Sequence, residues 1–459
     1  MHRLLGVFTA FVLLVPVVAV MSPDGVPSNT TITTTVSPSI NFTTSSTSTS
    51  TTTTMTTVPP FMTTTIPESS DLELTGDLVV DGTEHQLYGT NFGPRRLEGN
   101  GYQILVVNGG TLDWNGVIVT NVSRIMFTDG AGPSTLRNMI IEGSGRPELG
   151  FYPLHWHLNH DTTRGTLVQN VTVRDSLNRA FVPHGSHGIT FLNDRAENIA
   201  GPGLWWDAPG TNTEADPSWE CRNGRDHYCT LDNSNDIIVD GMVVDGVTNT
   251  PGDSRGFLLA AYTLGAGSGN VIRNSAAHNV NPSHVKDCSG FDWPAKAAGN
   301  LGGNVWVFEN NSFSGGPCHG IFVWQNDGNH HIIDGFVGIP SPSKINETGV
   351  GGGIDHGAYG NDYDYRNVTV PYIEVHAVGW VLSDSDVGEI ILRKHAFAGT
   401  VTFTNVTGTK ISVLDAPISN GEPIMFTVNG TNLTCDDVDW VNPHPETRVV
   451  VDGVDCSRP

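Results

Sequence analysis

The chain has 459 residues, and 23 lysines and arginines stand against 47 aspartates and glutamates, for a formal net charge of −24. It has no basic stripe that would neutralise phosphates, so the composition excludes nucleic acid as a main partner. The negative net charge also opposes general attraction to polyanions. With 53 glycines, a chain of this length is typical of a solenoid or a large all-β fold.

The first 22 residues and the segment that follows predict export. Arg3 precedes an apolar run to Val20, which is a signal-peptide pattern; an uncleaved N-terminal anchor is the alternative, because no clear cleavage site follows. Residues 23–70 are mostly Thr, Ser and Pro and cannot bury a core. They predict either a stalk that holds the folded part away from a cell surface or the flexible leader of a secreted enzyme.

Residues 71–148 carry the signals of short strands. Runs such as QILVVNGG, GVIVTNV and MIIEG place Val and Ile between Gly and Asn turns. We expect an N-terminal cap and the first coils of a solenoid here, because solenoid ends need capping.

Residues 150–207 hold a cluster of histidines on short strands that read LHWHL, AFVPH and GLWWD. Side chains alternate between the two faces of a strand. We therefore expect His155 and His157 to share one face, and Trp156 to share the other face with Leu154 and Leu158.

These strands align as successive coils of a parallel β-helix. A shift of 27 residues (184 − 157) places His157 on His184, and a shift of 23 (207 − 184) places His184 on Asp207. Equivalent residues then lie about 4.8 Å apart. Such a column, with His155 beside it, suits a divalent metal (calcium or zinc) or an acid/base pair. The alternative is a structural ladder of hydrogen-bonded side chains that repeats from coil to coil.

The same segment resembles a known family. YPLHWHL, SLNRAFVPHGSHGITFLND and GLWWD are similar to the region shared by the cell-surface hyaluronidase, the cell-migration-inducing hyaluronan-binding protein and fibrocystin. The resemblance extends over residues 81–334 and is specific within 149–207. It implies a right-handed β-helix and a hyaluronidase-like activity. It also gives an alternative for residues 71–148, which would be a shortened form of the family's eight-glycine β-domain instead of a cap and the first coils.

By this resemblance, five residues fall on family motif positions: His155, His157, His184, His187 and Asp207. The chain departs from the family at Leu154, Trp156 and Trp206. Trp206 replaces a family glutamate, which weakens any mechanism that needs two acids.

A polar insertion occupies residues 208–235. Cys221 and Cys229 are predicted to pair and close a short loop. Because the insertion directly follows Asp207, it either supplies side chains to the same site or is an ordinary surface loop. The candidate side chains are Glu214, Asp216, Glu220, Arg225, Asp226 and His227.

Repeated segments after the insertion predict further coils. Runs from Asn270 and Asn304 lie 34 residues apart (304 − 270), as do runs from Gly256 and Gly290 (290 − 256), and the run from Gly320 follows after 30 (320 − 290). Asparagines at the strand edges fit turn positions, where Asn tolerates left-handed backbone. These are Asn274, Asn279, Asn310 and Asn311.

The cysteines agree with this alignment. Cys288 and Cys318 each precede an aligned glycine by two residues, so they are expected to stack and to form a disulfide. Cys435 and Cys456 then pair near the C-terminus. Six pairable cysteines indicate an oxidising compartment.

Aromatic and basic residues near the histidines suggest glycan contacts. If Leu204 and Trp206 face inward, Trp205 faces outward and can stack on a sugar; Trp324 and His187 are further substrate-binding candidates. Six arginines are candidates for a positive patch: Arg95, Arg96, Arg164, Arg174, Arg179 and Arg195. Five polar residues lie near the same face, although turn roles are favoured for them: Asp292, His319, Gln325, Asn326 and Asp327.

The sequence thus predicts an all-β, right-handed, single-stranded parallel β-helix, a pectate-lyase-like solenoid with capping β segments. Its main body is residues 149–337, and residues 338–459 form a Gly-rich loop, the last coils and a C-terminal β cap. No G-x-S-x-G, P-loop or H-E-x-x-H motif is present.

We expect a secreted or cell-surface monomer that acts on an extracellular polysaccharide, as a lyase or a glycosidase. The catalytic candidates are His157, His184, Asp207 and Arg179, and the metal-ligand candidates are His155, His157, His184 and Asp207. A non-catalytic adhesin or glycan-binding module is the alternative.

Overall fold

The computed structural model describes residues 71–82, 95–206, 234–248, 258–264, 269–281, 287–293, 306–323, 331–340, 351–356, 363–375, 381–393, 402–414, 425–429, 431–442 and 447–458. The chain divides into two units, residues 1–62 and 63–459, and every described residue belongs to the second. The predicted signal peptide or anchor and the Thr-rich linker lie outside the described residues.

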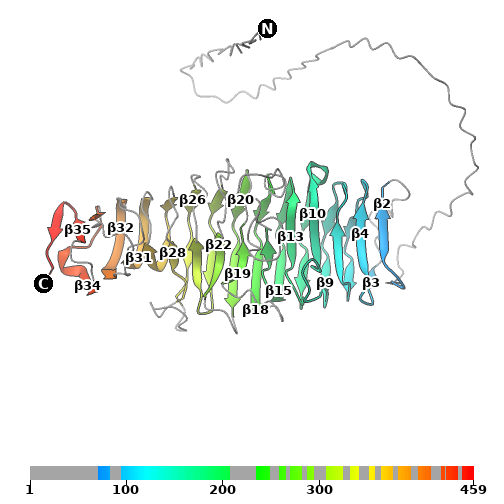
Figure 1. The fold of residues 1–459 in the computed structure, drawn as a ribbon, viewed down its shortest axis with the longest axis horizontal. Coiled ribbons are helices and arrows are strands. Elements are labelled where there is room, and N and C mark those ends of the chain that lie inside the picture. The colour runs from blue at the N-terminus through cyan, green and yellow to red at the C-terminus, as the bar shows by residue number, and fades with distance from the viewer. Residues whose placement is uncertain are drawn as a thin grey trace, which may run out of the picture. The chain divides into compact units, whose positions relative to one another are not determined.

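The described strands stack in sequence order along one axis, from β2 to β35 (Figure 1). From β3 to β27, each strand pairs in parallel with the strand three places later, as β4 does with β7, β7 with β10, and β10 with β13. Three strands therefore make one coil, and equivalent strands build three long parallel sheets. The predicted right-handed parallel β-helix is confirmed.

We call the sheet that carries the histidines sheet I. Its strands are β2 (Leu78–Asp81), β4 (Gln103–Val107), β7 (Arg124–Phe127), β10 (Leu154–His160), β13 (Phe181–Ser186), β16 (Leu204–Trp205), β19 (Leu258–Thr263), β22 (Asp287–Trp293), β25 (His319–Val323) and β28 (Ile354–His356).

Sheets II and III complete the coils. Sheet II contains β5 (Asp113–Asn115), β8 (Thr135–Arg137), β11 (Thr166–Gln169), β14 (Ile189–Leu192), β17 (Ile238–Asp240), β20 (Asn270–Arg273), β23 (Trp306–Glu309), β26 (His331–Asp334) and β29 (Tyr363–Arg366). Sheet III contains β1 (Leu72–Glu73), β3 (Arg96–Glu98), β6 (Ile118–Thr120), β9 (Ile140–Glu142), β12 (Thr172–Arg174), β15 (Arg195–Ala200), β18 (Val243–Thr248), β21 (Ala276–Val280), β24 (Ser312–Ser314) and β27 (Val337–Gly338).

Longer strands form the last coils, and a small separate sheet follows. The long strands are β30 (Thr369–Val375), β31 (Val381–Arg393) and β32 (Thr402–Leu414), with β34 (Val438–Asn442) after them. The small sheet contains β33 (Met425–Val428), β35 (Arg448–Val451) and β36 (Val454–Cys456). Two short 3-10 helices are η1 (Asp161–Thr163) and η3 (Cys435–Asp437).

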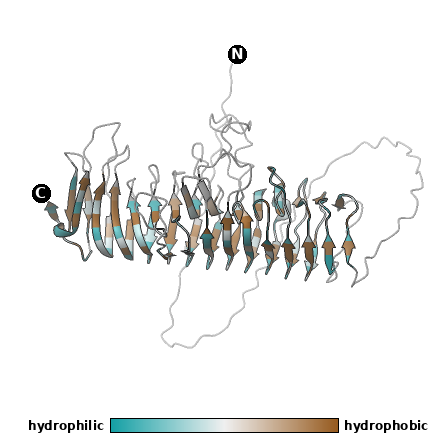
Figure 2. Cartoon of the chain, turned by 90° about the horizontal axis from the view of Figure 1, so that it is seen from below, coloured by the Kyte–Doolittle hydropathy of each residue, from teal (hydrophilic) through white to brown (hydrophobic). Residues whose placement is uncertain are grey.

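The core is the inward row of each sheet. Apolar side chains alternate with polar ones along the strands, as the bands in Figure 2 show. Phe127 stacks on Trp156 from the next coil with ring centroids 5.1 Å apart, and Tyr262 stacks on Phe291 at 4.6 Å. These stacked core side chains fix the register in which the outward side chains also stack.

Buried polar side chains hold the corner between sheets I and II. The Asn159 amide accepts a hydrogen bond from the Ala131 N–H (3.1 Å) and donates one to the Phe127 carbonyl (2.8 Å). Ser186 continues this ladder in the next coil, where its hydroxyl accepts from the Asn159 N–H. The corner polar groups are bonded because an unpaired buried group is costly.

The turns explain the asparagines at the strand edges. Asn274, Asn279 and Asn310 have φ of +52°, +51° and +52°, which is the left-handed conformation that Asn tolerates. Asn311 differs from the prediction: it is buried in a corner, where its Oδ1 accepts the Ser275 N–H at 2.8 Å.

The predicted register is right in three places and wrong in two. His157 pairs with His184, Phe181 with Leu204, and Ser289 with His319, which are shifts of 27, 23 (204 − 181) and 30 (319 − 289). The shift of 34 is wrong: Tyr262 pairs with Phe291 after 29 (291 − 262), and Asn270 with Trp306 after 36 (306 − 270). Turn lengths vary between coils, so similar letters in neighbouring coils need not be equivalent residues.

Two of the predicted disulfides are confirmed. Cys288 bonds Cys318 and Cys435 bonds Cys456, with Cα–Cα distances of 4.8 Å and 5.1 Å. The predicted Cys221–Cys229 pair lies outside the described residues. Within the described ranges, no helix is long and apolar enough to cross a bilayer.

Asp194, in the corner between β14 and β15, gives a test of these buried polar groups. Its Oδ1 accepts the Val171 N–H at 2.7 Å, and burial raises the pKa of the carboxyl well above its ordinary value. A raised pKa stabilises the fold below the unfolded pKa of about 3.9, and this stabilisation is lost as the pH rises through the folded pKa.

We therefore expect Asp194→Asn to become progressively more stable than the wild type above about pH 4, by about 1.4 kcal/mol for each pH unit between the unfolded and folded pKa values. Urea denaturation between pH 4 and pH 8 measures the difference. A difference in unfolding free energy that does not change with pH would show that the carboxyl is ionised in the native protein.

Candidate functional site

Three histidines meet on the outward face of sheet I. His155 and His157 lie on β10, and His184 lies on β13 at the position paired with His157. Leu154 and Trp156, between and beside them, are fully buried in the core. The strand alternation predicted from the sequence therefore places the imidazoles outward as expected.

The imidazole rings are close enough to interact. The His157 and His184 ring centroids are 4.9 Å apart with the planes at 90°. The His155 ring is 5.2 Å from His157 and 6.3 Å from His184. Because like charges at such distances oppose one another, His157 and His184 both disfavour a charged His155.

His155 is the most buried member, with 3% of its surface exposed. Neither ring nitrogen has a hydrogen-bond partner in the described part of the chain. Burial, followed by the nearby His157 and His184, holds the pKa of His155 well below its ordinary value, while the Gly150 backbone acts weakly in the opposite direction. The ring is therefore neutral at physiological pH.

An arginine and two aromatic rings flank the imidazoles. The Arg179 guanidinium donates to the Tyr152 hydroxyl at 2.6 Å and lies over the Trp205 ring. The Tyr152 ring meets His155 edge-on, with centroids 4.9 Å apart. We call these six residues the histidine cluster: Tyr152, His155, His157, Arg179, His184 and Trp205.

The environment of Trp205 agrees with the predicted alternation but changes its expected role. Leu204 and Trp206 are fully buried and Trp205 faces outward, half-buried. The guanidinium of Arg179 covers one face of its ring. A sugar would therefore meet an Arg–Trp pair and not an open indole face.

Sequence reasoning missed the part played by Tyr152 and Arg124. Tyr152 belongs to the YPLHWHL motif, which was the available signal. Arg124 lies one coil earlier, on β7. Its side chain donates hydrogen bonds to Gln103 Oε1 (2.8 Å) and to the Gly150 carbonyl (3.2 Å). The charge of Arg124 also lowers the pKa of His155. Arg124 and Arg146 line a shallow surface depression of about 410 Å³ beside the cluster.

Two predicted site residues, Asp207 and Trp324, lie outside the described residues, as do all the candidates from the 208–235 insertion. The paired register of Phe181 with Leu204 is the one that would place Asp207 over His184. The carboxylate of the predicted column therefore stays a prediction.

The end of β10 departs from regular strand geometry. Leu158 and His160 have φ of +52° and +51°, and the pairing register shifts between His157 and His160. Positive φ is unfavourable for such residues and turns the following side chains. The expectation that Leu158 faces the core is therefore wrong: it is 37% exposed.

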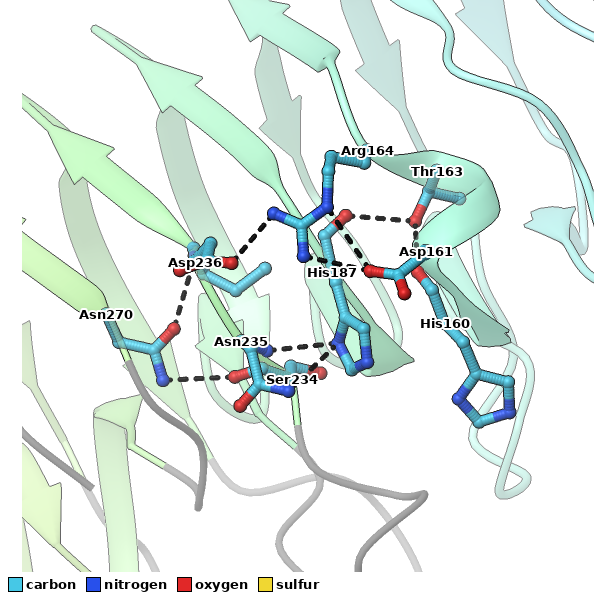
Figure 3. Close-up of polar contacts among 10 residues, drawn as sticks. His160, Asp161, Thr163, Arg164, His187, Ser234, Asn235, Asp236 and Asn270 are labelled. Carbon is cyan, nitrogen blue, oxygen red and sulfur yellow. Dashed lines mark hydrogen bonds and ion pairs between the residues drawn. The ribbon is translucent and has the colours of Figure 1, made fainter. Parts of the chain in front are cut away.

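The other two histidines of the segment form a separate group at the turn after β10 and β13, shown in Figure 3. The Nδ1 atom of His187 accepts the Asn235 N–H at 3.1 Å, and the His160 ring centroid lies 6.0 Å away. Burial lowers the pKa of His187. The predicted substrate-binding role of His187 stays a prediction, and the residue lies apart from the histidine cluster.

The predicted arginine patch is not present. In Figure 3 the guanidinium of Arg164 bridges Asp161 (2.9 Å) and Asp236 (2.7 Å). Arg174 and Arg195 pair with carboxylates on sheet III, at 2.5 Å from Glu142 and 2.7 Å from Glu197. Of the six predicted arginines, Arg179 is the one that lies in the histidine cluster.

The donor set bears on the predicted divalent metal. Imidazole nitrogens suit zinc, whereas calcium prefers oxygen ligands. Among the described residues no three His, Cys, Asp or Glu side chains are arranged to hold a metal ion. The histidines would need a ligand from elsewhere, and Asp207 is the predicted one.

Comparisons with known proteins agree with the fold of this segment. Residues 120–208 match the family model described as the CEMIP β-helix. This segment is similar to the CEMIP β-helix. The match confirms the resemblance predicted from the sequence, and it contains the whole histidine cluster.

One similar solved structure is the catalytic domain of a GH87 α-1,3-glucanase in complex with tetrasaccharides, with 14% sequence identity and a TM-score of 0.45. The alignment covers 86% of this chain and 70% of that chain. At this identity the similarity carries no information about site residues. Comparison with curated protein sequences finds no significant match.

His155 gives a test of whether the cluster is built for stability. An unsatisfied buried polar group costs about 1–3 kcal/mol, so His155→Leu should raise the free energy of unfolding by about 1 kcal/mol. Asn159→Leu is the matched control, because it removes two buried hydrogen bonds and should lower stability by about 2 kcal/mol or more. Denaturant titration measures both. A large loss of stability in His155→Leu would mean that the ring has a partner, such as a bound metal.

Proposed function

We propose that this protein cleaves an extracellular, uronate-containing polysaccharide by β-elimination at the histidine cluster. The observation that carries the proposal is that three imidazoles share one outward face with Tyr152, to whose hydroxyl the Arg179 guanidinium donates a hydrogen bond. A lyase needs a base for the proton at C5, a cation beside the uronate carboxylate and an acid for the leaving oxygen. The described cluster contains one candidate for each of these roles.

In this proposal Arg179 pairs with the substrate carboxylate, and the resulting loss of charge makes the C5 proton more acidic. His157 or His184, which are less buried than His155, takes that proton. The C4–O bond breaks as the C4=C5 double bond forms, and the Tyr152 hydroxyl gives its proton to the leaving oxygen. His155 lies beside both candidate bases, with its ring 5.2 Å from His157 and 6.3 Å from His184.

The residues of the histidine cluster favour elimination over hydrolysis. Hydrolysis requires two carboxyl groups at the cleaved bond. At the histidine cluster the predicted carboxylate is Asp207, and Trp206 stands at the family's glutamate position. A bound zinc ion on His157, His184 and Asp207 is a separate proposal; it would supply Lewis-acid stabilisation of the substrate carboxylate.

The proposed setting is extracellular. Two disulfides favour an oxidising compartment. The signal-like start and the Thr-rich segment support a secreted or surface-tethered protein.

Replacing both paired histidines tests the proposal. The His157→Ala, His184→Ala double variant should lose about 10²- to 10⁴-fold in lyase activity, which is the usual contribution of a general base. The full chain is incubated with hyaluronan, chondroitin, pectate and alginate, and the absorbance of the new C4=C5 double bond is followed. Metal content is measured on the same preparations, before and after chelation.

His278→Ala is the control, because His278 is a half-buried histidine on sheet III, bonded to Ser314 at 2.7 Å. It should keep full activity. Binding of a polysaccharide without any cleavage would refute the lyase and support the glycan-binding module. New reducing ends without double-bond absorbance would instead indicate hydrolysis.

A further inference from the structure

Asn-x-Ser/Thr sequences recur in the turns of the β-helix. Such a sequence, in which x is any residue except proline, is the acceptor for N-glycosylation and marks surface loops of secreted proteins. Six acceptor sequences lie wholly within the described residues. They begin at Asn121, Asn170, Asn310, Asn367, Asn405 and Asn432.

Four of these six stand in one column, at the corner between sheets II and III. Asn170 separates β11 from β12, and Asn310 separates β23 from β24. Asn367 follows β29, and the register of β29, β31 and β32 carries the same turn to Asn405. We call Asn170, Asn310, Asn367 and Asn405 the corner asparagines.

The acceptor groups of this column lie on the surface of the folded chain. Each corner asparagine is exposed and has left-handed backbone, with φ between +51° and +53°. The residue after it turns inward and is buried, as Val171 and Val368 are. The Ser or Thr at the third position then returns to the outward face, where it is half-buried or exposed.

The geometry of the turn explains the asparagines but not the third residues. Asn tolerates left-handed backbone, so it recurs at this turn in coils that have no acceptor sequence. In three such coils the turn asparagine is followed at the third position by Ile, Arg or Ala; these are Asn138, Asn193 and Asn274. The turn therefore accepts apolar, charged and small residues there and does not itself require Ser or Thr.

The hydrogen bonds of the corner asparagines leave room for a modification. The Nδ2 atoms of Asn170, Asn367 and Asn405 each donate one bond to a side chain of the preceding coil, over 2.7–3.0 Å. An amide nitrogen carries two N–H groups, so each bond uses one of them. An N-linked sugar replaces one N–H, and the other still serves the ladder between coils.

The column also leaves space between neighbouring acceptors. Gly335 lies between Asn310 and Asn367, and Asp384 lies between Asn367 and Asn405. Because successive coils are about 4.8 Å apart, the closest corner asparagines are about 9.6 Å apart. N-glycans are bulky, and acceptors in successive coils would crowd them.

We propose that the corner asparagines carry N-glycans. The corner between sheets II and III is the one that does not border sheet I. N-glycans there cover this corner and leave the outward face of sheet I, with its histidine cluster, free. The proposal goes beyond the lyase and rests only on the proposed export, which the two disulfides favour.

The modification is a transfer from an oligosaccharide that is linked to a lipid diphosphate. The asparagine Nδ2 atom bonds to C1 of the first sugar as the C1–O bond to the diphosphate breaks. The lipid diphosphate leaves with the electron pair of that bond, and the amide loses one proton to a base of the transferase.

Peptide mapping by mass spectrometry tests the proposal on the full chain secreted by its natural host. Peptides with the corner asparagines should be heavier by an oligosaccharide, which peptide-N-glycosidase removes while it converts each asparagine to aspartate. Asn138 is the internal control, because it occupies the same turn without an acceptor sequence and should be unmodified. Thr172→Ala should lose the N-glycan of Asn170, and Thr172→Ser should keep it.

Three outcomes would overturn the proposal. The first is a secreted chain with unmodified corner asparagines, and the second is an N-glycan on Asn170 that persists in Thr172→Ala. The third is a chain retained in the cytosol, which removes the export on which the proposal rests. Lyase activity is assayed separately with the His157→Ala, His184→Ala variant, so the two proposals can fail independently.

Discussion

The functional surface of this protein depends on the stacking of core side chains from coil to coil. Phe127 on Trp156 and Tyr262 on Phe291 are such contacts, and each sets the register of its strand pair. Once an inward residue is fixed on its equivalent, the alternation of the strand fixes the outward residue as well. The His157–His184 pair therefore follows from the register of β10 and β13, in which the buried Leu154 lies on the buried Phe181, and no attraction between the imidazoles is needed.

This dependence explains how much the sequence predicted. The β-helix, the stacking of His157 on His184 and two disulfides were predictable because neighbouring strands repeat one inward–outward pattern. The 34-residue period failed because coil length is set by turns, and turns change length without disturbing the core. Tyr262 and Phe291 are equivalent although the letters around them suggest another alignment.

The candidate site was predicted less completely than the fold, for three physical reasons. The contact of Arg179 with Tyr152 and Trp205 depends on side-chain reach across coils, which strand alternation does not give. The left-handed backbone at Leu158 reverses the faces after His157, and a leucine carries no signal of such a conformation. Three of the six predicted arginines pair with carboxylates outside the histidine cluster, as Arg174 does with Glu142, so sequence proximity to the histidines did not imply a shared patch.

His155 and Asp292, both on the outward face of sheet I, share one physical property. Burial is the main cause of both the lowered pKa of His155 and the raised pKa of Asp292. Each leaves polar atoms without partners, at a cost of about 1–3 kcal/mol per group, while the inner corner ladder is bonded. Such atoms are not confined to the outward row, since Asp194 in the corner between sheets II and III also has a buried oxygen without a partner among the described residues. Such local departures from good packing are expected where a protein meets its substrate. In the proposed lyase the neutral His155 lies beside His157 and His184, which are the candidates for the base.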